Sequence, residues 1–474
     1  MSDIVVVLDN GASTVKTGLA NRSNPGVESP CRLIPNAVIR SKGDKTTYFG
    51  HEFERCRDYS SLHYRLPFEK GYLVDWDAQK AVWDGIFSDE VLDINTTESS
   101  LFITEPYFNL PNIQEVYDQF VFEEYEFQSY YRCTPASVIP CGTLFAQSGL
   151  PPPDCMIVID SGFSFTHVVP ILNGHIVWDA VKRLDVGGKL LTNHLKELVS
   201  YRQWNMMEET YIMNDVKESC CFVSTNFHED LETCKVDVKS NPIVQEYVLP
   251  DLSRNRKGRV RQPEDIVTET DQILVMNNER FSVPEVLFRP DDIAGLEQAG
   301  LAHTVAFSIA LLPEDLRGMF WANIGLMGGN TKVPGFRDRL LAELRSLAPD
   351  DNDVFIYECN DPITEAYNAA LAFVTSTEID FSKRVVTKAD YAENGSNASR
   401  RKFRDWKQFG EDKEKLMSWI GKEREEKEKE FGKATTSMSG PDTTPANQPS
   451  GSTTTKLGRN KSRSMNVSGG GRKR

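Results

Sequence analysis

Two short apolar runs along the chain each end in a carboxylate and a glycine. The first run, Ile4–Leu8, leads into Asp9–Gly11, and the second, Met156–Ile159, leads into Asp160–Gly162. Apolar runs of this length that stop at a turn signal predict β-strands, and the apolar stretch after each turn predicts a hairpin. The tip of such a hairpin can hold phosphate, so two hairpins that face each other would clamp a nucleotide.

Other patterns place helices and a joint around these hairpins. Asp75 predicts the N-cap of a helix whose apolar positions run from Ala78 to Ile86. The stretch Leu190–Val199 has its apolar residues on one face and predicts an amphipathic helix. Three consecutive prolines at 151–153 predict a rigid, non-helical joint just before the second hairpin. The joint is a natural division between two lobes.

The remaining segments differ in pattern from these lobes. Residues 253–271 lack apolar periodicity, are basic at their start and predict an exposed loop. The globular pattern fades after Phe373 and is expected to end at Glu393–Ser396. Residues 400–431 are dense in charge and predict a helix that seeks a partner, and the Ser/Thr/Gly/Pro-rich segment from Thr435 predicts disorder. The apolar residues at helical spacing in the charged stretch are Phe403, Trp406, Leu416, Trp419 and Ile420.

Charge and cysteine content narrow the class of protein. The 474 residues carry a formal charge of −15, and the last 41 carry seven basic residues against Asp442, so a tail of +6 follows a body of −21. An acidic body does not coat nucleic acid broadly. Nine cysteines without a CxxC pair disfavour a disulfide framework or zinc site and indicate a reducing compartment. The apolar runs are far shorter than a bilayer requires, so we expect a soluble intracellular protein without membrane contact.

The two hairpins carry the groups that a magnesium-bound nucleotide needs. Asp9 and Asp160 supply carboxylates that order the hydration shell of Mg²⁺, and Lys16 supplies a cation for the phosphates. Gly11 and Gly162 allow close approach of the backbone. A single hairpin of this kind is commonplace and is more often structural. Its recurrence about 150 residues later, as in a duplicated fold, favours the nucleotide site.

A third element and one helix extend this site. Gly328 and Gly329 form a tight turn after an apolar strand, where backbone can approach a base or ribose, although an ordinary strand-to-helix turn explains them equally well. Lys217 and Glu218 could grip adenine and ribose, but alone they fit a solvated helix face better. His167 lies among apolar residues and is expected to be a satisfied core residue rather than a general base.

The order of these three motifs resembles the actin family, within the superfamily that includes sugar kinases and Hsp70 chaperones. The likeness extends from Ile4 to about Phe373. It implies an α/β, duplicated two-lobed nucleotide-binding fold followed by a disordered basic C-terminal tail. Longer strings resemble one branch of the family, actin-related protein 6: Glu105–Asn109, Phe122–Gln128, Asp160–His167 and Gly187–Glu197.

The resemblance also implies how the chain is divided. Lobe one would comprise residues 1–150, completed by 355–383, and lobe two residues 151–354 with 253–271 as an added loop. Residues 394–433 would form the charged extension and 434–474 the basic tail. On this likeness Asp9, Gly11, Lys16, Asp160, Gly162, Lys217, Glu218, Gly328 and Gly329 would bind ATP, with Mg²⁺ held through water by Asp9 and Asp160.

Several departures from the family pattern point to retention of ATP without hydrolysis. Actins carry a Gln, which helps to orient the attacking water, in the segment where this chain has Pro140, and an Asp where it has Phe163. The loss of each of these two groups would raise the activation barrier to ATP hydrolysis by a few kcal/mol. Asn214 replaces an expected Arg beside the adenosine, which weakens the case for base binding. Between Arg40 and Tyr48 the connection is short, where actin has a longer loop that grips its neighbour in the filament.

The resemblance therefore implies a non-catalytic nuclear subunit of a SWR1-type chromatin-remodelling complex. Such a complex exchanges a conventional core histone for its Z variant and so regulates transcription. The other subunits of the complex would be its partners, contact with the nucleosome or DNA would be allowed, and the chain would not form a homopolymer. We expect the protein in the nucleus, and a cytoplasmic pool is compatible with this expectation. The alternative is a slow ATPase or an actin-like cytoskeletal protein that uses the same cleft.

Overall fold

The computed structural model describes most of residues 3–403. Its gaps are residues 25, 27–28, 44, 60, 147–150, 236–239, 252–256 and 267. Within these described parts, no helix is both long and apolar enough to cross a bilayer.

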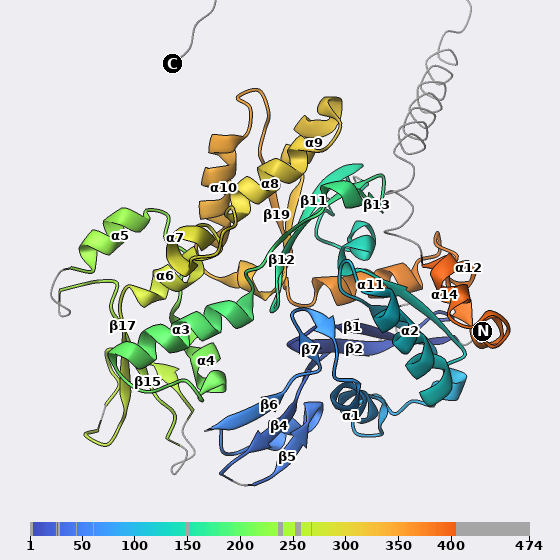
Figure 1. The fold of residues 1–474 in the computed structure, drawn as a ribbon, viewed down its shortest axis with the longest axis horizontal. Coiled ribbons are helices and arrows are strands. Elements are labelled where there is room, and N and C mark those ends of the chain that lie inside the picture. The colour runs from blue at the N-terminus through green and yellow to red at the C-terminus, as the bar shows by residue number, and fades with distance from the viewer. Residues whose placement is uncertain are drawn as a thin grey trace, which may run out of the picture. The chain divides into compact units, whose positions relative to one another are not determined.

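The first large sheet contains the first predicted hairpin. Its strand order is β20-β10-β9-β1-β2-β3. β1 and β2 pair as an antiparallel hairpin, and β9 and β10 run parallel to β1 (Figure 1). The strands of this sheet are β1 (Ile4–Asn10), β2 (Thr14–Asn21), β3 (Arg32–Pro35), β9 (Ser100–Thr104), β10 (Ser129–Cys133) and β20 (Val386–Thr387).

The second large sheet repeats this plan. β11 and β12 form the antiparallel hairpin, while β18 runs parallel to β11 and β19 parallel to β18. β13 and β14 pair with β12. The strands are β11 (Cys155–Ser161), β12 (Thr166–Leu172), β13 (His175–Ile176), β14 (Lys182–Leu184), β18 (Ile324–Met327) and β19 (Ile356–Glu358). In each sheet a hairpin stands beside two parallel strands, which confirms the predicted duplicated α/β fold.

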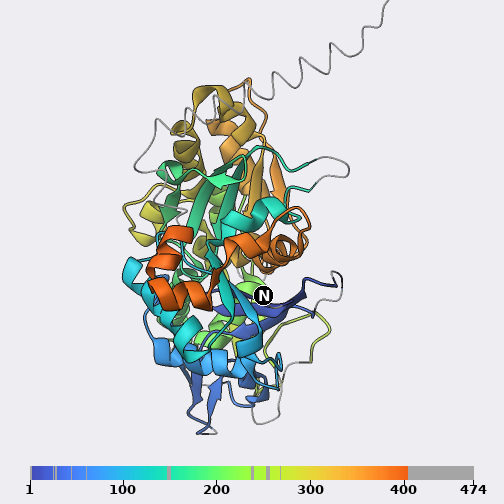
Figure 2. The same cartoon turned by 90° about the vertical axis from the view of Figure 1, so that its right-hand side faces the viewer.

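Helices cover both faces of the first sheet. Asp75 caps α1 (Trp76–Phe87) as predicted, because its carboxylate accepts a hydrogen bond from the amide of Ala78 at 3.1 Å. α1 and α2 (Pro111–Gln119) contribute to one apolar cluster with this sheet. α11 (Glu365–Thr375) packs on the other face, in a cluster that also includes residues of β11 and β12 and thereby joins the two sheets (Figure 2).

The second sheet has its own helices. α8 packs against β12 and β14, α9 against β11, and α10 against α8 (Figure 1). α3 and α4 pack against each other in lobe two. The bounds are α3 (Gly188–Arg202), α4 (Thr210–Cys220), α8 (Leu301–Ala310), α9 (Arg317–Trp321) and α10 (Phe336–Leu347).

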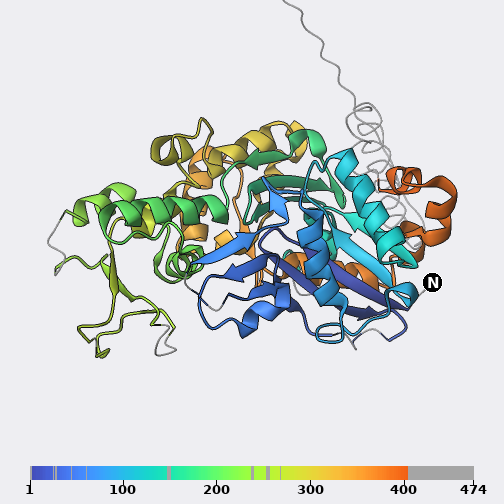
Figure 3. The ribbon, with the colours of Figure 1, turned by 60° about the horizontal axis from the view of Figure 1, so that its bottom comes forward.

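Two small sheets extend the lobes. One has the order β5-β4-β6, from β4 (Val38–Ser41), β5 (Thr47–Phe49) and β6 (Leu62–Arg65), and lies close to the helices of lobe two (Figure 3). The other has the order β16-β15-β17, from β15 (Gln245–Val248), β16 (Arg259–Val260) and β17 (Ile273–Met276).

The predicted loop 253–271 is more structured than its sequence indicates. Arg259 and Val260 form β16 and pair with Val248 and Tyr247 of β15. Both residues of β16 are half-exposed. A two-residue edge strand that buries neither face shows no alternation of apolar and polar positions, so the pattern could not reveal it. The residues of this loop at 253–256 and 267 lie outside the described residues.

The ordered body also continues past its predicted end at Glu393–Ser396. Helices α13 (Lys388–Asn394) and α14 (Asn397–Lys402) lead to Phe403, which is only 8% exposed. The Phe403 ring packs edge-on against Tyr130 at 5.2 Å and Tyr131 at 5.4 Å. Phe403 therefore belongs to the core of lobe one and does not await a partner. The other apolar residues of 400–431 and the tail 434–474 lie outside the described residues.

We expect Phe403→Ala to lower the free energy of unfolding by about 3 kcal/mol, because loss of a buried aromatic ring leaves a cavity against β10. Urea denaturation followed by circular dichroism measures this change. Phe307→Ala is the matched control, since the ring of Phe307 is 58% exposed, and its effect should stay below about 0.5 kcal/mol. Equal effects of the two substitutions would contradict the placement of Phe403 in the core.

Candidate functional site

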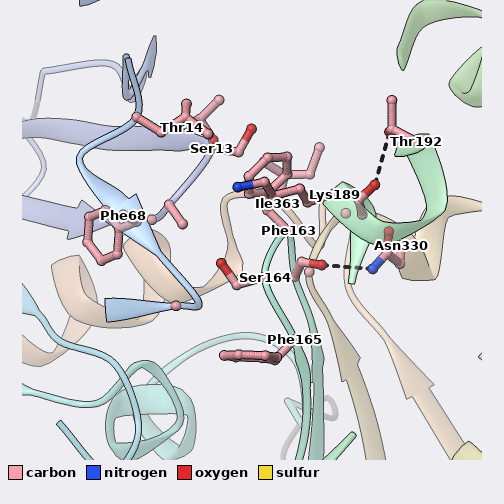
Figure 4. A pocket seen from close by; sticks show the side chains of 18 of the residues that line it. Ser13, Thr14, Phe68, Phe163, Ser164, Phe165, Lys189, Thr192, Asn330 and Ile363 are labelled. Carbon is pink, nitrogen blue, oxygen red and sulfur yellow. Dashed lines mark hydrogen bonds between the residues drawn. The ribbon is translucent and has the colours of Figure 1, made fainter. Parts of the chain in front are cut away.

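The tips of the two hairpins open into one cavity of about 1160 Å³. Its walls come from both lobes, and include all nine residues that the sequence assigns to a nucleotide site. Figure 4 shows Ser13 and Thr14 of the first hairpin turn on one side of this cavity and Thr192 and Asn330 on the other. The site therefore forms between the lobes, as a clamp requires.

The first hairpin tip holds an ion pair. The register of β1 and β2 places Asp9 opposite Lys16, and Lys16 Nζ lies 3.1 Å from Asp9 Oδ2. The hydroxyl of Thr104 donates a hydrogen bond to Asp9 Oδ1 at 2.7 Å. A Cβ at Gly11 would lie 2.7 Å from the carbonyl oxygen of Thr14, so only glycine fits this turn. The tip presents one cation and one carboxylate to the cavity.

The second hairpin tip holds Asp160, whose partner comes from the other lobe. The hydroxyl of Tyr107 donates to Asp160 Oδ2 at 3.0 Å and accepts from the backbone amide of Ala136 at 3.2 Å. Burial raises the pKa of Asp160 from 3.8 to about 6, against the opposing effect of the Tyr107 hydrogen bond. Gly162 differs from Gly11, because a Cβ there would meet nothing closer than 3.8 Å. Its carbonyl instead accepts hydrogen bonds from Asn330 Nδ2 at 2.8 Å and the amide of Gly188 at 3.0 Å.

The Gly-Gly turn lies directly against the second hairpin. Gly328 has φ +91°, and a Cβ there would lie 2.3 Å from the carbonyl oxygen of Ser161. Glycine is therefore required at Gly328 by the close approach of two backbones. A Cβ at Gly329 would only touch Ile363 at 3.8 Å. Gly329 thus leaves backbone accessible at the wall of the cavity.

Lys217 and Glu218 are neighbours on α4, but the first side chain is buried and the second is exposed. Lys217 is 7% exposed, and its ammonium donates to Thr192 Oγ1 and Asn214 Oδ1, both at 2.9 Å. Burial lowers the pKa of Lys217. Glu218 is exposed and accepts a hydrogen bond from Asn214 Nδ2 at 2.7 Å. Asn214 therefore bridges the pair at the position where the sequence comparison expects an Arg.

Of the two residues expected to replace the water-positioning groups, one lines the cavity. Phe163 follows β11 and lies in the cavity wall (Figure 4). Pro140 lies near the end of the 3₁₀ helix Pro135–Cys141 and is not among the residues that line the cavity. Pro135, at the start of the same helix, does line it.

His167 lies beside the floor of the cavity. The register of β11 and β12 places it opposite Asp160. Its ring packs on the ring of Tyr107, with centroids 4.4 Å apart. Burial lowers the pKa of His167 to about 3, so the imidazole is neutral at physiological pH. His167 therefore packs as predicted, and it is also one of the residues that line the cavity.

Sequence reasoning did not identify Thr104, Tyr107 or Asn330 as parts of the site. Thr104 is the last residue of β9 and Tyr107 follows it, and parallel strands place their carboxyl ends at the edge where ligands bind. That rule could have found them. Asn330, which follows the Gly-Gly turn, hydrogen-bonds Ser161 Oγ at 3.1 Å across 169 residues, a contact that no local pattern contains.

The donor set fits a hydrated magnesium ion rather than a directly ligated metal. In the part of the chain that the structure describes, no group of three or more His, Cys, Asp or Glu residues is arranged to hold a metal. Asp9 and Asp160 each use one side-chain oxygen on a protein hydroxyl. Carboxylates so engaged keep lone pairs for the water shell of Mg²⁺, which gives up its waters reluctantly.

Comparisons with known proteins agree with this architecture. The family model described as Actin matches residues 2–404. The chain is 50% identical over 419 residues to actin-like protein ARP6 of Cryptococcus neoformans, covering 84% of each chain. It is 39% identical to actin-related protein 6 of Drosophila melanogaster, covering 83% of this chain and 98% of the relative. It is 36% identical to actin-related protein 6 of Arabidopsis thaliana, covering 84% and 99%.

The buried carboxylate of Asp160 predicts a pH dependence of stability. Folding raises its pKa from 3.8 to about 6, so the folded chain binds this proton more tightly than the unfolded chain. The stability that the neutral form confers is present below about pH 4 and is lost as the pH rises to 6. Asp160→Asn stays neutral, so above pH 6 it should gain about 3 kcal/mol relative to the wild type.

Urea denaturation of the nucleotide-free protein between pH 4 and pH 7 measures this difference. Asp179→Asn, at an exposed position of the same lobe, is the control and should follow the wild type throughout. A constant offset between Asp160→Asn and the wild type across this range would show that Asp160 does not titrate as described.

Proposed function

The chain belongs to the actin family, and we propose that it is a non-catalytic nuclear subunit of a SWR1-type chromatin-remodelling complex. In this role it supports the exchange of a conventional core histone for its Z variant and so regulates transcription. The relatives that match at 36–50% identity over most of both chains, named actin-related or actin-like protein 6, support this assignment. The other subunits of the complex are its partners, and the nucleus is its main location, with a cytoplasmic pool.

The observation that carries the proposal is one cavity lined by all nine predicted nucleotide-binding residues, with the apolar side chain of Phe163 in its wall. When ATP is bound, Lys16 and the backbone at Gly11 and Gly162 would hold its phosphates. Asp9 and Asp160 hold the waters of Mg²⁺, which supplies the positive charge between the carboxylates and the phosphates. The adenosine is proposed to contact the four remaining residues, which also line the cavity: Lys217, Glu218, Gly328 and Gly329.

Two positions support binding without hydrolysis. Phe163, which lines the cavity, has a side chain with no hydrogen-bond donor or acceptor, and Pro140 stands in the segment where the family carries a Gln. The neutral His167 is held in the floor by its packing on Tyr107. A general base must reach the proton that it abstracts in a productive geometry. We therefore assign ATP a structural role.

A ligand that binds only the folded protein stabilises it by mass action. At a thousandfold excess over Kd this stabilisation is about 4 kcal/mol. A subunit that holds ATP without turnover keeps this stabilisation constant. That behaviour suits a scaffold.

We expect the purified protein to retain ATP and Mg²⁺ through gel filtration and to release no phosphate above the spontaneous rate. Chromatography of the extracted nucleotide and a phosphate-release assay measure both properties. Lys16→Ala should weaken ATP binding at least tenfold, because it removes the cation that faces the phosphates, a loss of about 1.4 kcal/mol or more. Lys80→Ala, which removes a cation paired with Asp84 on α1, should leave binding unchanged. Turnover near that of actin would establish the slow ATPase instead.

Deletion of residues 253–271 should weaken assembly with the partner subunits and leave the body folded. The deletion removes β16, while β15 and β17 still pair with each other. Co-purification from nuclear extracts with mass spectrometry measures assembly, and thermal melting of the variant checks its fold. Unchanged recovery of the partners with the folded variant would show that this segment is not an assembly surface.

A further inference from the structure

One edge of the small sheet β16-β15-β17 is bonded by side chains instead of by a strand. Among the strands that the structure describes, β17 pairs with β15 only, so its other side faces no strand. Figure 1 shows β15 and β17 beside α3. The two residues that follow α3, Gln203 and Trp204, contact the open side of β17.

The carboxamide of Gln203 makes both hydrogen bonds that a neighbouring strand would make with Val275. Gln203 Oε1 accepts from the amide of Val275 at 2.9 Å, and Gln203 Nε2 donates to the carbonyl oxygen of Val275 at 2.6 Å. A carboxamide carries the same kinds of donor and acceptor as a peptide group. The Gln203 side chain therefore takes the place that a peptide group of an added strand would take.

The indole of Trp204 extends this contact along the strand. Its Nε1 donates to the carbonyl oxygen of Ile273 at 3.2 Å. Alternate residues of a strand direct their backbone groups to the same side, so Ile273 and Val275 both face away from β15. The carbonyl oxygen of Gln272 faces β15 instead, where it accepts from the amide of Leu249 at 2.8 Å. Side chains thus occupy both outward groups of Val275 and the outward carbonyl of Ile273.

Without these side chains, the β17 edge would suit pairing with another strand. All residues of β17, Ile273–Met276, are apolar, and two of them are β-branched and favour strands. An apolar edge strand with open backbone groups is a template for pairing between molecules. Two identical strands pair antiparallel about a twofold axis, where Val275 of each copy would exchange both hydrogen bonds with Val275 of the other. Gln203 takes up these same two hydrogen bonds.

We propose that Gln203 and Trp204, which we call the edge guard, prevent β17 from pairing with the β17 edge of a second copy of this chain. The edge guard and the second copy compete for the same backbone groups, so the two contacts exclude each other. Because the edge guard belongs to the chain itself, its contact avoids the loss of translational freedom that association costs. Burial does not explain its place, since Trp204 is 44% exposed. The inference depends neither on ATP nor on the proposed complex.

Gln203→Leu tests the edge guard, because leucine has a similar volume but neither donor nor acceptor. The matched control is Gln272→Leu, which places the same side chain at an exposed position immediately before β17. In dilute full-length protein, we expect the amide of Val275 to exchange its hydrogen about tenfold faster in Gln203→Leu than in the control, the effect of one lost hydrogen bond. Exchange at Leu274, whose amide faces β15, should be equal in both variants. Hydrogen exchange with fragmentation mass spectrometry measures both amides.

Sedimentation equilibrium of the full chain measures association. We expect the wild type and Gln272→Leu to remain monomeric at high concentration. The double variant Gln203→Leu/Trp204→Phe, which keeps an aromatic ring but lacks all three guard hydrogen bonds, should form a dimer and about double its average mass. Adding Val275→Pro to the double variant should restore the monomer, because proline removes the outward amide and is tolerated at a sheet edge.

A double variant that stays monomeric at every concentration would overturn the proposal, even with faster exchange at Val275. A dimer that persists after Val275→Pro would show association through another surface and would overturn it as well, as would dimerisation of Gln272→Leu. Circular dichroism checks the fold of each variant, and if the double variant unfolds, the mass of Gln203→Leu alone decides. Loss of the proposed ATP binding or complex would leave these results unchanged, so the two proposals fail separately.

Discussion

Two carboxylates that face one cavity from two sheets govern the rest of this structure. Asp9 and Asp160 each sit at the tip of a hairpin, where burial penalises their charge. Asp9 meets this cost with Lys16 and Thr104 from its own lobe. Asp160 has a hydroxyl from the other lobe instead. The second hairpin therefore depends on lobe closure, or on a bound cation, more than the first does.

The same geometry bears on the proposed retention of ATP without hydrolysis. The groups that would hold phosphates and a hydrated cation are ionic or backbone groups at the hairpin tips. Phe163 also lines the cavity, and its side chain can neither donate nor accept a hydrogen bond. In the proposed function, binding uses the hairpin tips, and the apolar wall at Phe163 does not orient water.

Local chemistry was predictable from the sequence, and contacts between distant segments were not. The hairpin tips and the Asp75 cap follow from strand ends and turns that a few neighbouring residues define. Gly328 instead requires glycine because of the carbonyl oxygen of Ser161, which lies 167 residues earlier in the chain. Tyr107 and Phe403 gain their roles from partners 53 and at least 271 residues away in the chain.

A contact between the lobes and a ligand that favours the same closed state affect each other through population. If only a fraction of the free protein is closed, the apparent Kd for a ligand of the closed state rises in inverse proportion to that fraction. The hydrogen bond from Tyr107 of lobe one to Asp160 of lobe two favours the closed state. Because Asp160 also belongs to the proposed nucleotide site, lobe closure and nucleotide binding depend on the same side chain.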